Sequence, residues 1–175
     1  RVETGRGAVD ANLMGRLQQL AGVQYALAGY PKQALAIFQA QVRDTNVQGA
    51  RGYAFGGNRQ IAAFLVQMGD VEQAEAYLRR SLALIQEART SGLPGWRTGY
   101  AGFGQSWESD IEFHRGLILE ARGQFREAEA AYRVSEVRRR ASVKAILSQK
   151  NPPPESLIIL AADTMVLYQA RMKTR

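Results

Sequence analysis

The sequence predicts an all-α protein: a solenoid of three stacked helical hairpins followed by one more helix. One phrase of eleven residues recurs at 29–39, 69–79 and 123–133, with Gly first, Ala five residues later and a large residue four further on. Apolar residues recur at helical spacing on both sides of each Gly, as in two amphipathic helices joined by a turn. Hairpins of this kind must stack to bury their apolar faces, and 175 residues suffice for a buried core.

The first hairpin is expected at about 12–43. Leu17 and Leu20 precede the turn at helical spacing, Phe38 follows it, and Pro31 suits a first helical turn. The turn itself is expected at Gly29, because helices commonly end in a residue with positive φ, which glycine adopts without steric cost.

The second and third hairpins are expected at about 57–88 and 109–148. Asp70 followed by Gln73 has the pattern of a helix N-terminus with a reciprocal cap, and Ser109 with Glu112 repeats it. The Ala five residues after each turn Gly is expected where two helices cross closely, with the large residue beyond it filling the adjacent space.

The turn glycines lie 40 and then 54 residues apart, so two segments are longer than a hairpin needs. These segments, about 44–57 and 88–108, are rich in Gly and aromatic residues and are expected to be long insertions between hairpins. "NPPP" then ends the third hairpin, because proline cannot continue a helix. A final helix is expected at about 155–173, which makes residues 1–175 a single array. Its apolar face would carry Leu157, Ala161, Met165, Tyr168 and Met172.

This pattern resembles the tetratricopeptide repeat (TPR) family. The residues that carry the resemblance are Gly22, Tyr25, Gly29, Ala34 and Phe38 in the first unit, Ala62, Leu65, Gly69, Ala74 and Leu78 in the second, and Gly116, Gly123, Ala128 and Tyr132 in the third. The resemblance implies a non-enzymatic scaffold or recognition module that binds a protein or peptide, as part of a larger bacterial protein. The Pro that usually closes each repeat is missing, Gln41 replaces a small residue, and the family period is about 34 residues.

Two finer resemblances point in different directions. Some TPR domains bind the C-terminal carboxylate of chaperones through Lys, Arg and Asn; the matching positions here are Gln19, Val23, Gln60, Asp110 and His114, so that clamp is absent. The repeats with their Gly/aromatic insertions are also similar to the repeat region of bacterial CHAT-domain proteins, which precedes a caspase-like peptidase domain. This similarity implies an alternative function as the regulatory repeat region of such a peptidase. Its His/Cys pair would lie elsewhere, because the chain has no Cys.

The sequence offers little for catalysis. His114 is the only histidine, there is no cysteine, and no carboxylates cluster as a metal set or a triad would require. "GARGYAFGG" and "GYAGFGQ" lack the spacing of a phosphate-binding loop. We therefore expect no enzymatic activity, no cofactor and no metal. An enzyme with its site in the aromatic segments is the competing class, and full activity after substitution of each of His114, Asp110 and Glu112 would count against it.

The net charge of +7 raises a second alternative, a basic nucleic-acid-binding helical repeat. The densest basic stretch runs from Arg138 to Lys150. Arg133 and Arg140 each follow a Glu by four residues, which favours a solvated helix face with ion pairs over phosphate contacts. No apolar run is long enough to predict a membrane span. The compartment stays open: cytoplasmic, or periplasmic if a signal peptide preceded Arg1.

Aromatic and arginine side chains concentrate in and beside the two insertions, where such residues anchor protein interfaces. The competing interpretation is that they fill gaps between the hairpins. The candidate partner-binding residues are Tyr53, Phe55, Arg59, Trp96, Arg97, Tyr100, Phe103 and Trp107.

Overall fold

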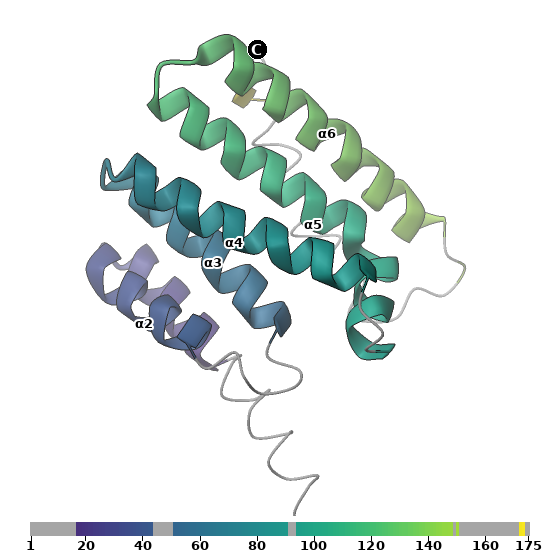
Figure 1. Cartoon of the computed structure of the whole chain (residues 1–175), viewed down its shortest axis with the longest axis horizontal. Coiled ribbons are helices and arrows are strands. Elements are labelled where there is room, and N and C mark those ends of the chain that lie inside the picture. The colour runs from purple at the N-terminus through teal and green to yellow at the C-terminus, as the bar shows by residue number, and fades with distance from the viewer. Residues whose placement is uncertain (1–16, 44–50, 91–93, 149, 151–171, 174–175) are drawn as a thin grey trace, which may run out of the picture. The chain divides into compact units, whose positions relative to one another are not determined.

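The structure is a computed structural model that describes residues 17–43, 51–90, 94–148, 150 and 172–173 (Figure 1). Side chains at 51–53 and 94–103 lie outside this description. The described residues are helical and include no strand, so the all-α prediction is confirmed. The chain divides into two compact units between Thr98 and Gly99.

The first unit contains a helix at 17–27, α2 (Pro31–Arg43), α3 (Arg51–Gln67) and α4 (Val71–Thr90). Its turns lie at Gly29 and Gly69, both with φ of +82°. After the second turn, an Asp70 carboxylate oxygen accepts the backbone N–H of Gln73 at 3.2 Å, and the Gln73 amide donates to the other oxygen at 2.5 Å. The predicted positive-φ turns are therefore confirmed in this unit, and Asp70 caps the helix as predicted. The reciprocal half of the cap is not formed, because the backbone N–H of Asp70 donates to the Leu65 carbonyl and the Gln73 side chain bonds to the Asp70 carboxylate.

Helix α3 packs against both α2 and α4. The Phe38 and Phe64 rings stack across the α2–α3 contact with centroids 5.8 Å apart. A Cβ added at Gly57 would lie 2.8 Å from a Val42 methyl carbon, so the absent side chain lets the two helices approach closely. The core of this unit includes Ala34, Phe38, Ile61, Ala62, Leu65, Ala74, Leu78 and Ile85.

The second unit contains α5 (Pro94–Ala121) from Gly99 onward and α6 (Phe125–Leu147), and the two helices are joined at Gly123 with φ of +76°. Figure 1 shows the two helices side by side. Phe113, Ala128 and Tyr132 form its apolar cluster. A Cβ added at Gly116 would lie 2.6 Å from Tyr132 Cδ1, so a large ring fills the space that glycine leaves.

One packing register recurs relative to the turn glycines. The residue seven positions before each turn Gly is small. The residue five positions after the Gly is a buried Ala, the residue nine positions after it is large and buried, and the residue twelve positions after it is polar and buried. In chain order these sets are Gly22, Ala62 and Gly116; Ala34, Ala74 and Ala128; Phe38, Leu78 and Tyr132; and Gln41, Ser81 and Ser135. Both glycines of the first set face an aromatic ring.

The two predicted insertions are the main correction to the sequence analysis. Residues 51–57 belong to α3, 88–90 to α4 and 94–108 to α5, so the described parts of these segments are helical. A glycine costs a helix only about 1 kcal/mol relative to Ala. Close helix packing, as at Gly57, outweighs that cost.

Two further predictions need comment. Ser109 does not cap a helix, because it lies inside α5 and its hydroxyl bonds to α6. The final helix at 155–173 falls outside the described residues except for 172–173, which are helical.

Candidate functional site

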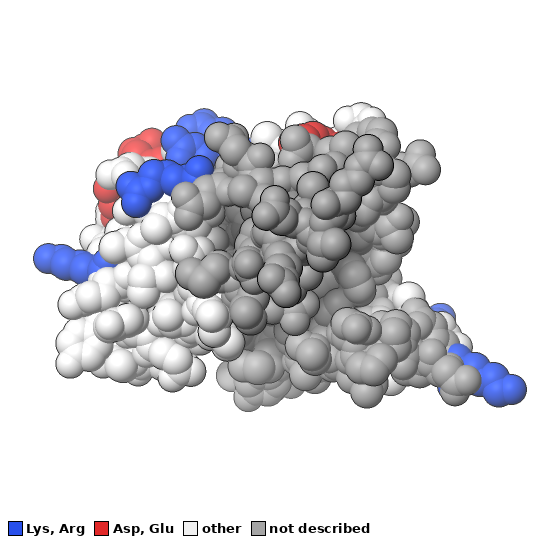
Figure 2. Space-filling model, turned by 90° about the horizontal axis from the view of Figure 1, so that it is seen from below, with Lys and Arg blue, Asp and Glu red and all other residues white. Residues whose placement is uncertain are grey.

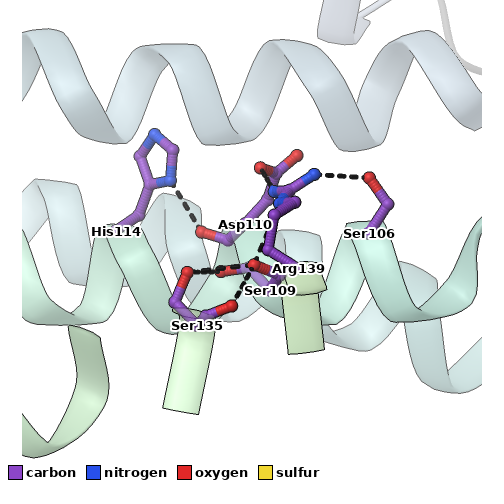
Figure 3. Close-up of polar contacts among 6 residues, drawn as sticks. All are labelled: Ser106, Ser109, Asp110, His114, Ser135 and Arg139. Atoms are coloured by element: carbon purple, nitrogen blue, oxygen red, sulfur yellow. Dashed lines mark hydrogen bonds and ion pairs between the residues drawn. The ribbon is translucent and has the colours of Figure 1, made fainter. Parts of the chain in front are cut away.

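The most elaborate polar arrangement in the described part of the second unit joins α5 to α6 (Figure 3). On α5, Ser109 and Asp110 follow Ser106 by three and four residues, and on α6, Arg139 follows Ser135 by four residues. Residues at these spacings share one side of a helix, so each helix directs its polar group toward the other.

Arg139 is the centre of this cluster and is only 1% exposed. Its Nη1 donates to the Ser106 hydroxyl at 2.6 Å, and its Nε donates to the Ser109 hydroxyl at 3.1 Å. Its Nη2 forms an ion pair with the Asp110 carboxylate. A buried guanidinium needs this compensation, because an isolated buried charge is very costly.

Ser109 and Ser135 add a reciprocal bridge between the two backbones. The Ser109 hydroxyl donates to the Ser135 carbonyl at 2.8 Å, and the Ser135 hydroxyl to the Ser109 carbonyl at 2.9 Å. Both serines are fully buried. In the first unit, Ser81 at the equivalent position donates to the Phe55 carbonyl at 3.2 Å. Small hydroxyl side chains thus hold the paired helices close at the same register.

His114 lies one turn beyond Asp110 and is buried. Its Nδ1 is 2.7 Å from the Asp110 carbonyl oxygen. Because a carbonyl only accepts, Nδ1 carries the proton and donates it. This ring nitrogen is engaged with its own helix.

In the second hairpin, the positions that correspond to Arg139 and Asp110 carry no charged residues. Counted from the turn glycines, Arg139 corresponds to Ile85, and Asp110 corresponds to Gly56. Ile85 is 1% exposed, as Arg139 is. The fold therefore does not require an ion pair at this register, and the cluster is a particular property of the third hairpin.

A second polar group lies near the turn of α5 and α6. The Tyr132 hydroxyl donates to Glu120 at 2.6 Å, and Lys173 Nζ lies 2.8 Å from both oxygens of that carboxylate. The hydrogen bonds from Lys173 and Tyr132 lower the pKa of Glu120. Burial and the bond to Glu120 raise the pKa of Tyr132. Residue 173 is thereby tied to the third hairpin.

Basic residues on α6 are largely engaged in ion pairs. Arg133 pairs with Glu129 and Arg140 with Glu136, as the sequence predicts. The prediction of a solvated face is wrong for Arg139, because its partners lie on α5. Figure 2 shows some of the described basic side chains on the face that it presents.

The first unit has a hollow of about 270 Å³ among α2, α3 and α4. Its walls are mainly apolar, and the Asn58 amide in its lining donates to the Ala54 carbonyl at 2.8 Å. The lining residues are Val42, Ala54, Asn58, Arg80, Ala83, Leu84 and Glu87. A hollow of this character suits an apolar group of a ligand.

The candidate partner-binding residues are placed only in part. The side chains of Tyr53, Trp96, Arg97, Tyr100 and Phe103 lie outside the described residues. The three that are described lie on helices: Phe55 is 4% exposed on α3, Arg59 is half-buried on α3, and Trp107 is half-buried on α5. A joint aromatic surface stays a prediction.

Sequence reasoning missed the Arg139 cluster. Its signal was the register itself, since aligning the chain on the turn glycines places Arg139 at the position of the core residue Ile85. Within the described residues, no three His, Asp or Glu side chains gather in a way that could hold a metal ion. No described helix is both long and apolar enough to cross a membrane.

Compared with protein-family models, with curated proteins and with solved structures, the chain matches none. The functional inference therefore rests on the residues of the chain itself.

Proposed function

We propose that the chain is a TPR-like helical-repeat module that binds a protein or peptide partner and has no catalytic role of its own. The observation that carries this proposal is the packing register repeated around Gly29, Gly69 and Gly123. Repeated helical hairpins that stack on their neighbours typically serve as extended binding surfaces. Stacking of the three hairpins into one solenoid is part of the proposal.

The chemistry of the polar clusters supports a binding role over a catalytic one. Arg139 is compensated by a carboxylate and two hydroxyls, and His114 donates from one nitrogen to a carbonyl of its own helix. Neither arrangement pairs a nucleophile with a general base. These groups join helices, and the apolar hollow on α2, α3 and α4 offers space for a partner's side chain.

A displayed library of random peptides, selected against the immobilised full chain, tests the proposal. We expect a family of peptides with a shared motif, whose binding saturates at one peptide per chain in titration calorimetry. A library that yields no saturable binder after repeated selection would contradict a peptide-recognition function.

A further inference from the structure

Helix α6 carries a second apolar face in addition to the one packed on α5. Ala130, Val134, Val137 and Ala141 are spaced by four, three and four residues and are all exposed; Val134 is 42% and Val137 68% exposed. We call these four residues the α6 stripe. The buried residues of α6, among them Ala128 and Tyr132, lie on the other side of the helix.

The stripe is not explained by helix formation. Valine is a poorer helix former than the straight-chain residues, because branching at Cβ restricts its side chain in a helix. Surface positions on a helix are commonly charged or polar, yet this line keeps four apolar side chains over three turns. The spacing of four and three residues is the seam along which one helix packs against another.

One edge of the stripe is lined by exposed basic residues. Arg126, Arg133 and Arg140 recur every seven residues beside it, and Lys144 extends the line. The carboxylates that pair with Arg133 and Arg140 sit on the outer side of this edge, in surface ion pairs that contribute little and can exchange partners. Over its length α6 has six basic and three acidic residues.

We propose that the α6 stripe binds an amphipathic helix of a partner protein, one with aliphatic residues along its seam and Asp or Glu along the edge that meets Arg126, Arg133 and Arg140. This inference rests on the proposed function and specifies its partner. Charge complementarity selects this occupant over a second copy of the chain. Antiparallel pairing of two α6 helices would oppose their basic edges. Parallel pairing would oppose the basic edge to an edge with one acid, Glu127, and one base, Arg138, so neither pairing meets the basic edge with a line of acids.

The test uses a displayed library of helical peptides of about 21 residues, which is three heptads. The seam positions of each peptide are aliphatic, and the positions along its edges vary between Glu and Lys. Selection against the full chain should enrich Glu on the edge facing the basic line. The selected peptide, made synthetically, should lose affinity at least about tenfold for the double variant Val134→Gln/Val137→Gln. It should bind more weakly as salt is raised, because exposed charges are screened.

Two variants make the test specific. Leu82→Gln changes a comparably exposed leucine on α4 and should leave binding unchanged. Arg126→Glu combined with Lys144→Glu reverses exposed charges beside the stripe and should shift the selected edge from Glu to Lys.

Three outcomes would overturn the proposal. The first is a selection without edge preference, and the second is equal loss of binding in Leu82→Gln. The third is a dimer of the wild-type chain in analytical ultracentrifugation that Val134→Gln/Val137→Gln dissociates, which would assign the stripe to a second copy. If a peptide from the random library binds the wild-type chain and all α6 variants with equal affinity, the proposed function is supported but the α6 stripe is not its binding site.

Discussion

Removing the Asp110 carboxylate should destabilise the protein strongly, because it leaves the Arg139 charge uncompensated. Arg139 is 1% exposed, and the Asp110 side chain is 11% exposed, so little water can replace the lost partner. Breaking a buried ion pair from one side costs about 3–5 kcal/mol. Ser106 and Ser109 still accept from the guanidinium in Asp110→Ala, so we expect a loss near the lower end, about 3 kcal/mol.

Removing both charges should restore most of that stability. The second hairpin has Gly56 and Ile85 at the corresponding positions, and Ile85 is as deeply buried as Arg139. Apolar replacement of a buried ion pair is often neutral or stabilising. We expect the double variant Asp110→Ala/Arg139→Met to unfold within about 1 kcal/mol of the wild type, and so to be about 2 kcal/mol more stable than Asp110→Ala alone.

Urea denaturation of the full chain, followed by far-ultraviolet circular dichroism, measures these differences from the transition midpoints. Glu129→Ala is the control, because it removes an exposed pair with Arg133 and should cost at most about 1 kcal/mol. If Asp110→Ala costs no more than Glu129→Ala, or if the double variant is as unstable as the single one, the argument from burial is refuted.

Four other predictions test the Gly69 turn and the contacts of Tyr132 and Glu120. Gly116→Ala should cost about 1–3 kcal/mol in thermal unfolding because its Cβ meets the Tyr132 ring, and adding Tyr132→Leu should recover part of it; a neutral single variant would contradict the close contact. Gly69→Ala should cost about 1 kcal/mol and Gly69→Asn less, since φ is positive and a Cβ there meets no atom; equal losses would be the unexpected result. The raised pKa of Tyr132 favours its neutral form in the folded state, so stability should fall as pH rises above about 10, and Tyr132→Phe should flatten that decline in denaturation curves. The lowered pKa of Glu120 works oppositely: its contribution is present above the unfolded pKa of about 4.3 and is lost as pH falls through the lower folded pKa, a loss that Lys173→Gln should reduce.

The features that the sequence predicts correctly depend on residues close together in the chain. Gly69 ends one helix and Asp70 caps the next within a few residues, and Arg133 meets a Glu one turn away. Such contacts follow from local geometry alone. Ser109 shows where this reasoning fails. Its spacing to Glu112 matches a helix cap, but a partner on α6, 26 residues away, holds it within a longer helix.

The burial of Arg139 was out of reach of local patterns for the same reason. Its three side-chain partners lie 29 to 33 residues earlier, and its neighbours Arg138 and Arg140 form pairs nearer the surface. The local pattern therefore predicts that Arg138, Arg139 and Arg140 all lie on a charged surface. Only alignment of the hairpins on their turn glycines indicates that Arg139 is the buried one. The glycine content of the two aromatic segments predicts loops, but their described parts are helical, and at Gly57 the missing side chain allows close helix packing.

The difference between Arg139 and Ile85 also affects which helices pair with each other when the chain folds. Repeated hairpins with similar seams can pair with the wrong neighbour, a characteristic failure of repeat proteins. If α6 paired with α3 in place of α5, Arg139 would meet Gly56 and Phe55, which offer no side-chain acceptor, and a charge would be buried alone. We expect this desolvation penalty to make the exchanged pairing less stable than the native one. The buried contacts of Arg139 with α5 would then specify that α6 pairs with α5 and not with α3.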